Sequence, residues 1–333
     1  MKAGKLSEAV LKRSVLRQFH TVDEQVVKPA VGQDCSVIAP PPGERIVHAV
    51  AAMPLAGMGM CTGTDQEALT VCSALNNIAC SGARPLGVLV NLLLPTSANE
   101  QLLRDLIGRI ERACERESVA VLGGHTEVAR CVTEPVLTVT AVGSVAESVR
   151  VDCGNVRPGM DIVMSKWAGL MGTSILAKHF EEKLCARYPA PFIDEAKCFE
   201  RYQSIRSEAA VAVQSGVAAM HDISEGGVYG ALWEMGQCSG VGLDIELKDI
   251  PIRQETVEVC EFFDVNPYKL LSTGSLLMAA EDGSSLVRAL GQAGVEAAVI
   301  GRATDSNDRV LVYEDERRFL EFTQTDELWH VLP

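Results

Sequence analysis

The residues of this chain whose types and spacing could do chemistry fall in two short polar clusters, each joined to a pair of glycines. The first cluster follows an apolar run at residues 119–122 and contains Gly123, Gly124, His125, Thr126 and Glu127. The apolar run predicts a short buried strand that stops at the glycines, where the backbone can turn sharply and another group can come close. An imidazole, a hydroxyl and a carboxylate just beyond such a turn suit a phosphate or a metal ion. The alternative is a tight turn with locally hydrogen-bonded side chains, and spacing alone leaves both open.

The second cluster follows another apolar run at residues 217–220. It contains His221, Asp222, Ser224 and Glu225, and then Gly226 and Gly227 at the start of a predicted helix. A strand that ends in an acid and leads to a glycine-lined helix start suits a phosphate at the helix N-terminus. An ordinary helix cap with tight packing at the glycines is the alternative. It explains one such cluster easily and two similar clusters in one chain less well.

Three further polar residues are candidates. Asp34 lies just ahead of a predicted strand, where it could be a ligand at the strand edge, although a turn-forming aspartate is the simpler interpretation. Asn76 and Asn77 lie in the middle of an apolar helical stretch, and side-chain amides compete with helix formation. They are therefore either buried and hydrogen-bonded or part of a site, and we favour the site.

The elements that must position these residues alternate between strands and helices, which predicts an α/β (α+β) fold. The first half contains an opening helix at residues 5–19 and then the order β-β-α-β-α-β-β. Its strands are predicted at 35–39, 46–52, 86–94, 119–122 and 134–145. Thr64 with Glu67, and Ser97 with Glu100, have the spacing of capping boxes at the starts of the two helices between these strands.

A boundary is predicted near Arg157-Pro158-Gly159, because proline and glycine interrupt regular structure. Beyond it, strands are predicted at 161–164, 217–220, 242–247, 275–280, 297–301 and 310–313. Helices are predicted up to about residue 185 and then at 194–215, 254–263 and 284–293, with a chain break at residues 188–191. We therefore expect two domains, residues 1–150 and 151–333.

Composition limits the classes of function. The chain has 333 residues and a net charge of −14, which argues against a nucleic-acid or membrane-surface binder, because such surfaces are basic. Its 11 cysteines include no CxxC pair and fit reduced thiols in a cytoplasmic protein. The first residues are charged throughout, unlike a signal peptide, and no apolar run is long enough to span a bilayer.

Six stretches in order carry a family resemblance: GKLSEAVLKRSVL, GQDCSVI, ALNNIACSGARP, GGHTEV, KWAGLMGTSILAK and HDISEGGVYGALWE. With them the chain resembles the aminoimidazole ribonucleotide (AIR) synthetase-related superfamily, and within it the HypE-type hydrogenase maturation factors. The resemblance implies a PurM-like two-domain fold, in which residues 1–150 bind ATP and form a homodimer through their sheet. It also implies ATP-dependent phosphorylation of an amide-type oxygen, with metal ions holding the phosphates.

Carried over by position, the resemblance implies nucleotide-binding residues among Asp34, Asn76, Asn77, the stretch from Gly123 to Glu127, Asp222 and Gly226-Gly227. The implied metal ligands are Asp34, Asn77 and Asp222. Members of the family usually have acids at the positions of Gln33, Met53 and Asn77. Because Mg²⁺ prefers carboxylate oxygen, we expect binding of ATP and Mg²⁺ to be weakened here.

A second departure concerns cysteine. HypE-type proteins end in a cysteine that carries the carbamoyl group, whereas the last cysteine here is Cys260, so we do not expect that chemistry. Two functions remain open. One is an ATP-using enzyme with an unknown amide-like substrate, for which no catalytic side chain can be assigned. The other is a non-catalytic, dimeric relative that binds a small-molecule or nucleotide ligand, or a partner.

Overall fold

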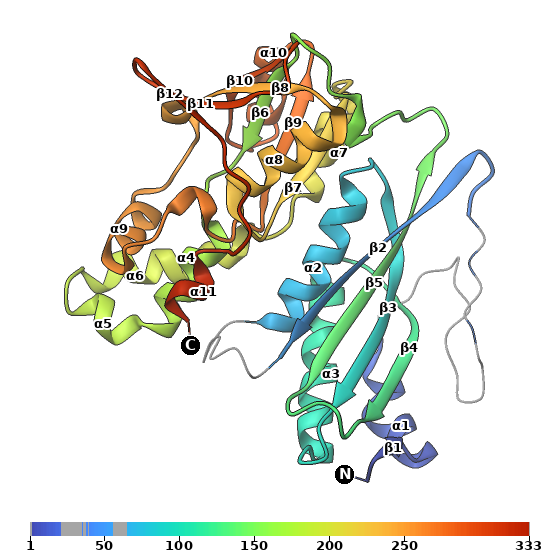
Figure 1. Ribbon diagram of the computed structural model, residues 1–333. Helices are drawn as coiled ribbons and strands as arrows, with labels where there is room; N and C mark the ends of the chain where they lie inside the picture. Colours follow the sequence, from blue (N-terminus) through green and yellow to red (C-terminus); the bar gives the residue numbers. More distant parts are fainter. Residues whose placement is uncertain (1, 21–34, 36–37, 39, 56–64, 333) are drawn as a thin grey trace. The chain divides into compact units, whose positions relative to one another are not determined.

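A computed structural model describes residues 2–20, 35, 38, 40–55 and 65–332, which form two compact units, each with its own sheet (Figure 1). The first unit includes Asp65–Ile78 and Ala83–Ser148, and the second is built mainly from Val149 onward. Both units mix helices and strands, so the predicted α/β class is confirmed.

The first unit is a five-stranded sheet with the order β1-β4-β3-β5-β2. Its strands are β1 (Gly4–Lys5), β2 (Glu44–Pro54), β3 (Arg84–Leu94), β4 (Val121–Val128) and β5 (Val136–Ala146). Its helices are α1 (Glu8–Ser14), the 3₁₀ turn η1 (Leu16–Gln18), α2 (Gln66–Ala79, whose last residue clusters with the second unit) and α3 (Glu100–Arg116). The predicted strand at 35–39 lies mostly outside the described residues.

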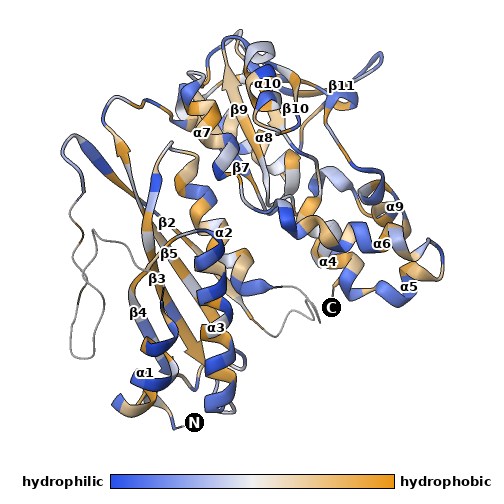
Figure 2. Ribbon diagram, turned by 180° about the vertical axis from the view of Figure 1, so that it is seen from behind, coloured by the Kyte–Doolittle hydropathy of each residue, from blue (hydrophilic) through white to orange (hydrophobic). Residues whose placement is uncertain are grey.

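One face of this sheet is covered by α2 and α3, which lie in front of it in Figure 2. Leu137, Val139 and Ala141 of β5 alternate toward this face and are fully buried. Helix α2 packs closely on β5, since a Cβ atom at Gly143 of β5 would lie 2.9 Å from Cδ1 of Ile78 in α2. Strand periodicity thus sends every second side chain of β5 into the core beneath the helices.

The opposite face of the sheet carries exposed apolar side chains. Ile46 and Val50 of β2 are 46% and 59% exposed, and Leu89 of β3 is 37% exposed. Val50 lies opposite Thr140 of β5, which in turn lies opposite Leu89. Val50, Thr140 and Leu89 therefore form a strip across three strands on this side of the sheet, and we call this side the open face.

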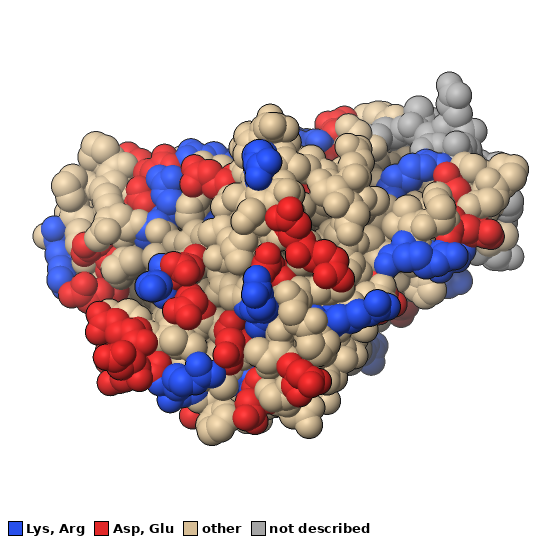
Figure 3. All heavy atoms as spheres, turned by 90° about the horizontal axis from the view of Figure 1, so that it is seen from above, with Lys and Arg blue, Asp and Glu red and all other residues tan. Residues whose placement is uncertain are grey.

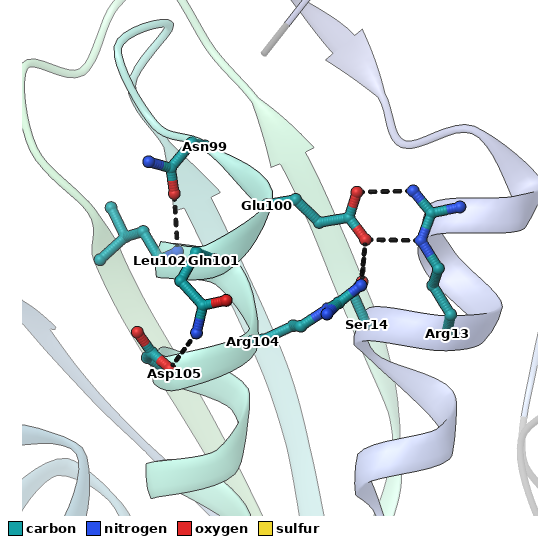
Figure 4. A network of polar contacts seen from close by, with 8 residues as sticks. All are labelled: Arg13, Ser14, Asn99, Glu100, Gln101, Leu102, Arg104 and Asp105. Carbon is teal, nitrogen blue, oxygen red and sulfur yellow. Dashed lines mark hydrogen bonds and ion pairs between the residues drawn. The ribbon is translucent and has the colours of Figure 1, made fainter.

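Helix α1 is fixed to α3 by the carboxylate of Glu100 (Figure 4). Arg13 donates two hydrogen bonds of 2.6 Å to it, and Ser14 and Arg104 donate bonds of 2.7 and 2.8 Å. The predicted capping box of Ser97 and Glu100 is therefore wrong. The cap of α3 is Asn99, whose Oδ1 accepts a hydrogen bond from the Leu102 N–H, because Glu100 is engaged by cations.

Two further expectations concern helix starts in the first unit. At the start of α2, Oδ1 of Asp65 accepts the Ala68 N–H, while the predicted capping box of Thr64 with Glu67 involves Thr64, which lies outside the described residues. The predicted helix at 5–19 is shorter, because Gly4 and Lys5 form β1 and pair with β4. Pairing with an edge strand satisfies backbone groups that a helix would otherwise use.

The second unit is a seven-stranded sheet with the order β12-β11-β8-β10-β6-β9-β7. Its strands are β6 (Asp161–Ser165), β7 (Ala219–Ile223), β8 (Gly242–Glu246), β9 (Ser275–Ala280), β10 (Ala297–Thr304), β11 (Arg309–Tyr313) and β12 (Glu316–Phe319). Its α-helices are α4 (Leu170–His179), α5 (Glu181–Cys185), α6 (Ala190–Lys197), α7 (Arg206–Gln214), α8 (Gly227–Ser239), α9 (Gln254–Phe263), α10 (Gly283–Gln292) and α11 (Leu328–Val331). Its 3₁₀ turns are η2 (Cys153–Asn155), η3 (Cys198–Tyr202), η4 (Leu247–Asp249) and η5 (Pro267–Lys269).

This sheet has a core on each face. Leu277 and Ala279 of β9 pack with Leu232 of α8 on one side, whereas Leu276 and Met278 pack with side chains of α7 and α10 on the other. All six residues of β9 are buried. A strand covered on both faces has a continuous apolar sequence instead of an alternating one, which is why residues 275–280 were predicted correctly.

The single helix predicted at residues 194–215 is wrong, because the structure divides it into α6, η3 and α7. Lys166 lies at the end of β6 and donates hydrogen bonds to the carbonyls of Tyr202 and Ser204, of 3.0 and 2.7 Å. These carbonyls point toward a buried ammonium, and between them the chain leaves the helical path, with η3 ending at Tyr202 and α7 beginning at Arg206. The break predicted at residues 188–191 lies where α5 ends and α6 begins, and Pro189 and Pro191 stand at the start of α6, where a missing N–H costs little.

Lysine, arginine and acidic side chains are intermingled on the face of the molecule drawn in Figure 3, and no broad basic field is seen there among the described residues. Among those residues, no helix is long and apolar enough to cross a membrane.

Candidate functional site

The first polar cluster lies within strand β4 and not in a turn. The prediction that the strand stops at Gly123-Gly124 is wrong, since β4 continues to Val128 and pairs in parallel with β3 throughout. Gly124 makes this possible. A Cβ atom there would lie 1.8 Å from the carbonyl oxygen of Val90, so only glycine allows the two strands to approach so closely.

Strand geometry separates the polar side chains that follow the glycines. His125 and Glu127 share one face, and a 3.0 Å contact joins Nε2 of His125 to Oε2 of Glu127. Both are well exposed, at 46% and 39%. His125 lies opposite Asn91, and Asn91 lies opposite Thr138. A polar row therefore crosses three strands on the open face, whereas Thr126 points to the helix-covered side, since successive strand residues alternate.

The two asparagines lie elsewhere in this unit. Asn76 is fully buried in α2, where its Oδ1 accepts a long contact from the Cys72 thiol, and Asn77 is partly buried. Since α2 covers the side of the sheet opposite His125 and Glu127, the structure does not bring these candidates together. Met53 is partly buried in β2 and pairs with Leu137, on the helix-covered side. Asp34 and Gln33 lie outside the described residues.

The second cluster spans the end of β7 and the start of α8. His221 and Asp222 are within the strand itself. The Nδ1–H of His221 donates to the Asp222 carbonyl oxygen at 2.8 Å, and its Nε2 lies 3.3 Å from Oε2 of Glu234 in α8. These two contacts fix the imidazole ring against the helix.

Asp222 lies beside this ring. Burial raises the pKa of its carboxyl group, the neighbouring Glu234 raises it further, and His221 lowers it. A carboxylate in such surroundings gains from a nearby positive charge, because both burial and like charge disfavour the ionised form. This environment suits a residue that contacts a cation or a proton.

The start of α8 is already occupied by a carboxylate of this chain. The Gly226 N–H donates to Oδ2 of Asp326 at 2.7 Å, while Oδ1 of Asp326 accepts from Leu271 at 3.1 Å and from Leu328 at 2.9 Å. Gly227 serves close packing, because a Cβ atom there would lie 2.6 Å from the Tyr268 carbonyl oxygen. The backbone at this helix start therefore binds an anion, which is Asp326 in this structure.

Asp326 is the residue of this site that sequence reasoning missed. It is 2% exposed, and burial raises its pKa to about 6 despite the three backbone donors. Only its position inside the partly apolar segment 326–332 hinted at burial. Nothing in its spacing connects it to a glycine 100 residues earlier.

Potential metal ligands do not gather in one place among the described residues. Among them, no group of three or more His, Cys, Asp and Glu side chains could hold a metal ion. The two clusters offer separate features, a polar row on an exposed sheet face in the first unit and an anion-binding helix start in the second.

Comparison with known proteins places both halves of the chain in one family. Residues 32–145 match the family model described as "AIR synthase related protein, N-terminal domain", and residues 157–314 match the corresponding "C-terminal domain".

Similar proteins agree with these matches. The chain is 30% identical over 289 residues to "Carbamoyl dehydratase HypE" of Rhodobacter capsulatus, covering 80% of this chain and 82% of the relative. The crystal structure of "Hydrogenase Maturation Protein HypE in complex with ATP" superposes with a TM-score of 0.79 at 16% identity, covering 98% of this chain and 97% of that one. A structure of a "HypE-HypF complex" gives a TM-score of 0.68 at 18% identity, covering 83% and 90%. The PurM-like fold inferred from the sequence is thereby confirmed.

Proposed function

Starting from the fact that this chain belongs to the AIR synthase related protein family, and that HypE proteins are among its relatives, we propose that it binds ATP and phosphorylates an amide-type oxygen of a small substrate. The observation that carries this proposal is the match of both halves together with 30% identity to a carbamoyl dehydratase. We assign nucleotide binding and dimerisation to residues 1–150, and the second AIR-synthase-like domain to residues 151–333.

In the reaction proposed, the amide oxygen attacks the γ-phosphorus of ATP, the bond to the β-phosphate oxygen breaks, and ADP leaves. The phosphorylated oxygen is then a good leaving group. It departs as inorganic phosphate when the amide nitrogen gives up its protons and a C≡N bond forms, or when a nucleophile attacks the carbon. In such transfers positioning and electrostatic stabilisation supply most of the catalysis. The candidate groups in this chain are the polar row with His125 and Glu127, Asp222, and the backbone at Gly226-Gly227.

The metal site is proposed to be partly degenerate. A magnesium ion would neutralise phosphate charge, with Asp34, Asn77 and Asp222 as its candidate ligands. Gln33, Met53 and Asn77 stand where the family resemblance predicts acids.

We also propose that the open face of the first sheet is the surface of a homodimer. Two observations support a second copy as its occupant. Ile46, Val50 and Leu89 leave an apolar strip exposed. The strip runs from the end strand β2 across β5 to the central strand β3. Such strips commonly mark interfaces.

A second candidate function is a non-catalytic, dimeric relative that binds a ligand or partner. Two observations favour it, the neutral side chains at Gln33, Met53 and Asn77 and the Asp326 carboxylate at the Gly226 N–H.

Calorimetric titration of the purified protein with ATP, with and without Mg²⁺, distinguishes the two candidate functions. Saturable binding of ATP but not of AMP, followed by release of ADP, supports the enzyme. ATP binding without turnover of any amide substrate supports the binding protein, and no heat with either nucleotide contradicts nucleotide binding altogether.

A further inference from the structure

Two cysteines far apart in the sequence meet in the second unit. Cys153 begins η2 and Cys238 lies in the last turn of α8. Their thiols are within hydrogen-bonding distance of each other. The backbones agree with this, because a Cβ atom at Gly154 would lie 3.7 Å from the carbonyl oxygen of Cys238.

Both segments are held firmly. In η2, the Gly154 N–H donates to Oδ1 of Asp152 at 2.8 Å, and Nδ2 of Asn155 donates to the Arg150 carbonyl at 2.8 Å. Helix α8 is anchored in the core by side chains such as Leu232 and Met235, which are fully buried. An oxidant joins two thiols held side by side by rigid elements far more readily than thiols free in solution.

The two thiols differ in surroundings. Cys238 is exposed, whereas Cys153 is partly buried. Burial, the nearby Cys238 and the acids Asp152 and Glu234 raise the pKa of Cys153 to about 12. Cys238 is therefore the thiol that an oxidant in solution reaches first, with Cys153 beside it as the second sulfur. Buried cysteines such as Cys72 and Cys114 have no such access.

We propose that Cys153 and Cys238 are a redox pair that forms a reversible disulfide with a peroxide as the oxidant. The Cys238 thiol loses its proton and its sulfur attacks one peroxide oxygen. The O–O bond breaks and the departing hydroxide takes up that proton, so that a sulfenic acid and water result. The Cys153 sulfur then attacks the sulfenic sulfur and loses its proton, and the second water leaves. The two sulfurs give up two electrons, which the peroxide takes, and a dithiol reductant reverses the change.

The disulfide would tie η2, at the start of the second unit, to α8. Glu234 lies four residues before Cys238, on the same side of the helix, and contacts His221. Oxidation would therefore restrain the helix that carries the partner of His221. This inference does not depend on the proposed function.

The test is oxidation of the purified full-length protein with hydrogen peroxide, blocking of free thiols, and peptide mass spectrometry. The expected result is a cross-linked pair of peptides containing Cys153 and Cys238, lighter by two hydrogens and released by dithiothreitol. In Cys153→Ser, Cys238 should instead proceed to sulfinic acid, and the exposed-cysteine control Cys198→Ser should cross-link like the wild type. Sulfinic acid at Cys238 in the wild type without a cross-link, or a cross-link from Cys153 to another cysteine, would overturn the proposal.

Discussion

Gly124 shows how one residue decides the geometry of the first cluster. Substitution by alanine puts a methyl group against the Val90 carbonyl, where a Cβ atom would be 1.8 Å away. Strand β4 must then move from β3, and we expect the free energy of unfolding to fall by roughly 3 kcal/mol or more, beyond ordinary overpacking. Denaturant unfolding measures the change.

The neighbouring glycine is the matched control for that experiment. A Cβ atom at Gly123 would meet its nearest atom, Cδ2 of Leu89, at an ordinary 3.6 Å. Gly123→Ala should therefore change the unfolding free energy by only about 0.5 kcal/mol. Equal effects of the two substitutions would show that β4 does not approach β3 as described.

Asp326 should make the free energy of unfolding depend on pH, and the sign of this dependence follows from its raised pKa. Burial raises its pKa from 3.8 to about 6 in the folded state. Between about pH 4 and pH 6 the folded protein therefore holds a proton that the unfolded chain has released, so the free energy of unfolding falls as pH rises through that window. The full contribution is about 3 kcal/mol, from 1.36 kcal/mol per pKa unit.

The Asp326→Asn variant should lose this slope, as measured by urea unfolding across the window. Asp282→Asn is the control, because Asp282 caps α10 and its pKa is lowered by Ser285. Because the pKa of Asp282 is lowered, its contribution to the free energy of unfolding is complete above its ordinary pKa of 3.8 and is lost only as pH falls below that value. The Asp282→Asn variant should therefore keep the wild-type decrease in unfolding free energy between about pH 4 and pH 6. A slope that persists in Asp326→Asn would mean that another group is responsible.

At the scale of elements, Glu100 decides whether α1 stays on α3. It joins Arg13 and Ser14 of α1 to Arg104 of α3. Glu100→Gln removes the charge that binds both arginines and should release α1. Limited trypsin digestion should then cleave at Arg13 or Arg17 several-fold faster than in wild type.

A matched variant tests whether charge loss alone explains such a result. Glu8→Gln also removes an acid from this region, but Glu8 pairs only with Lys12 of its own helix among the described contacts. Its cleavage rate should stay at the wild-type value. If both variants are cut equally fast, the link between α1 and α3 contributes nothing to holding α1.

The open face provides the element-scale test of dimerisation. Val50→Asp places a charge in the middle of the proposed interface, where an unpaired buried charge costs about 3 kcal/mol or more and so weakens association roughly a hundredfold. Sedimentation of the wild type should show a dimer, and sedimentation of Val50→Asp a monomer. Phe319→Asp changes a 70% exposed apolar side chain in the second unit and should remain dimeric. A monomeric wild type would contradict the proposal.

At the scale of the whole molecule, the altered acids test whether the nucleotide site is degenerate. The triple variant Gln33→Glu, Met53→Asp and Asn77→Asp restores carboxylates at the positions implied by the family resemblance. In the proposed metal site these carboxylates repel one another without a cation, so the melting temperature of the triple variant should fall without metal and recover with Mg·ATP, which binds the folded state. The wild type should respond weakly. Equal stabilisation of the wild type by Mg·ATP would favour an intact enzyme site.

The sequence by itself determined the elements whose signals are local. Residues 254–263 and 275–280 were predicted with the bounds that α9 and β9 have. Helical periodicity and continuous apolar character are properties of a few neighbouring residues, so they can be read without the fold. The motifs in their order also determined the family.

Only the tertiary structure decided where polar groups find their partners. Strand β4 continues past its glycines because it pairs with β3. Lys166 binds the Ser204 carbonyl within the helix predicted at 194–215. Asp326 accepts a hydrogen bond from the Gly226 N–H, 100 residues earlier in the chain. Each depends on contacts between segments distant in the chain. Buried backbone polar groups and buried charges need a hydrogen-bond or ion-pair partner, which the fold supplies. The local spacing of residues in the sequence does not identify that partner.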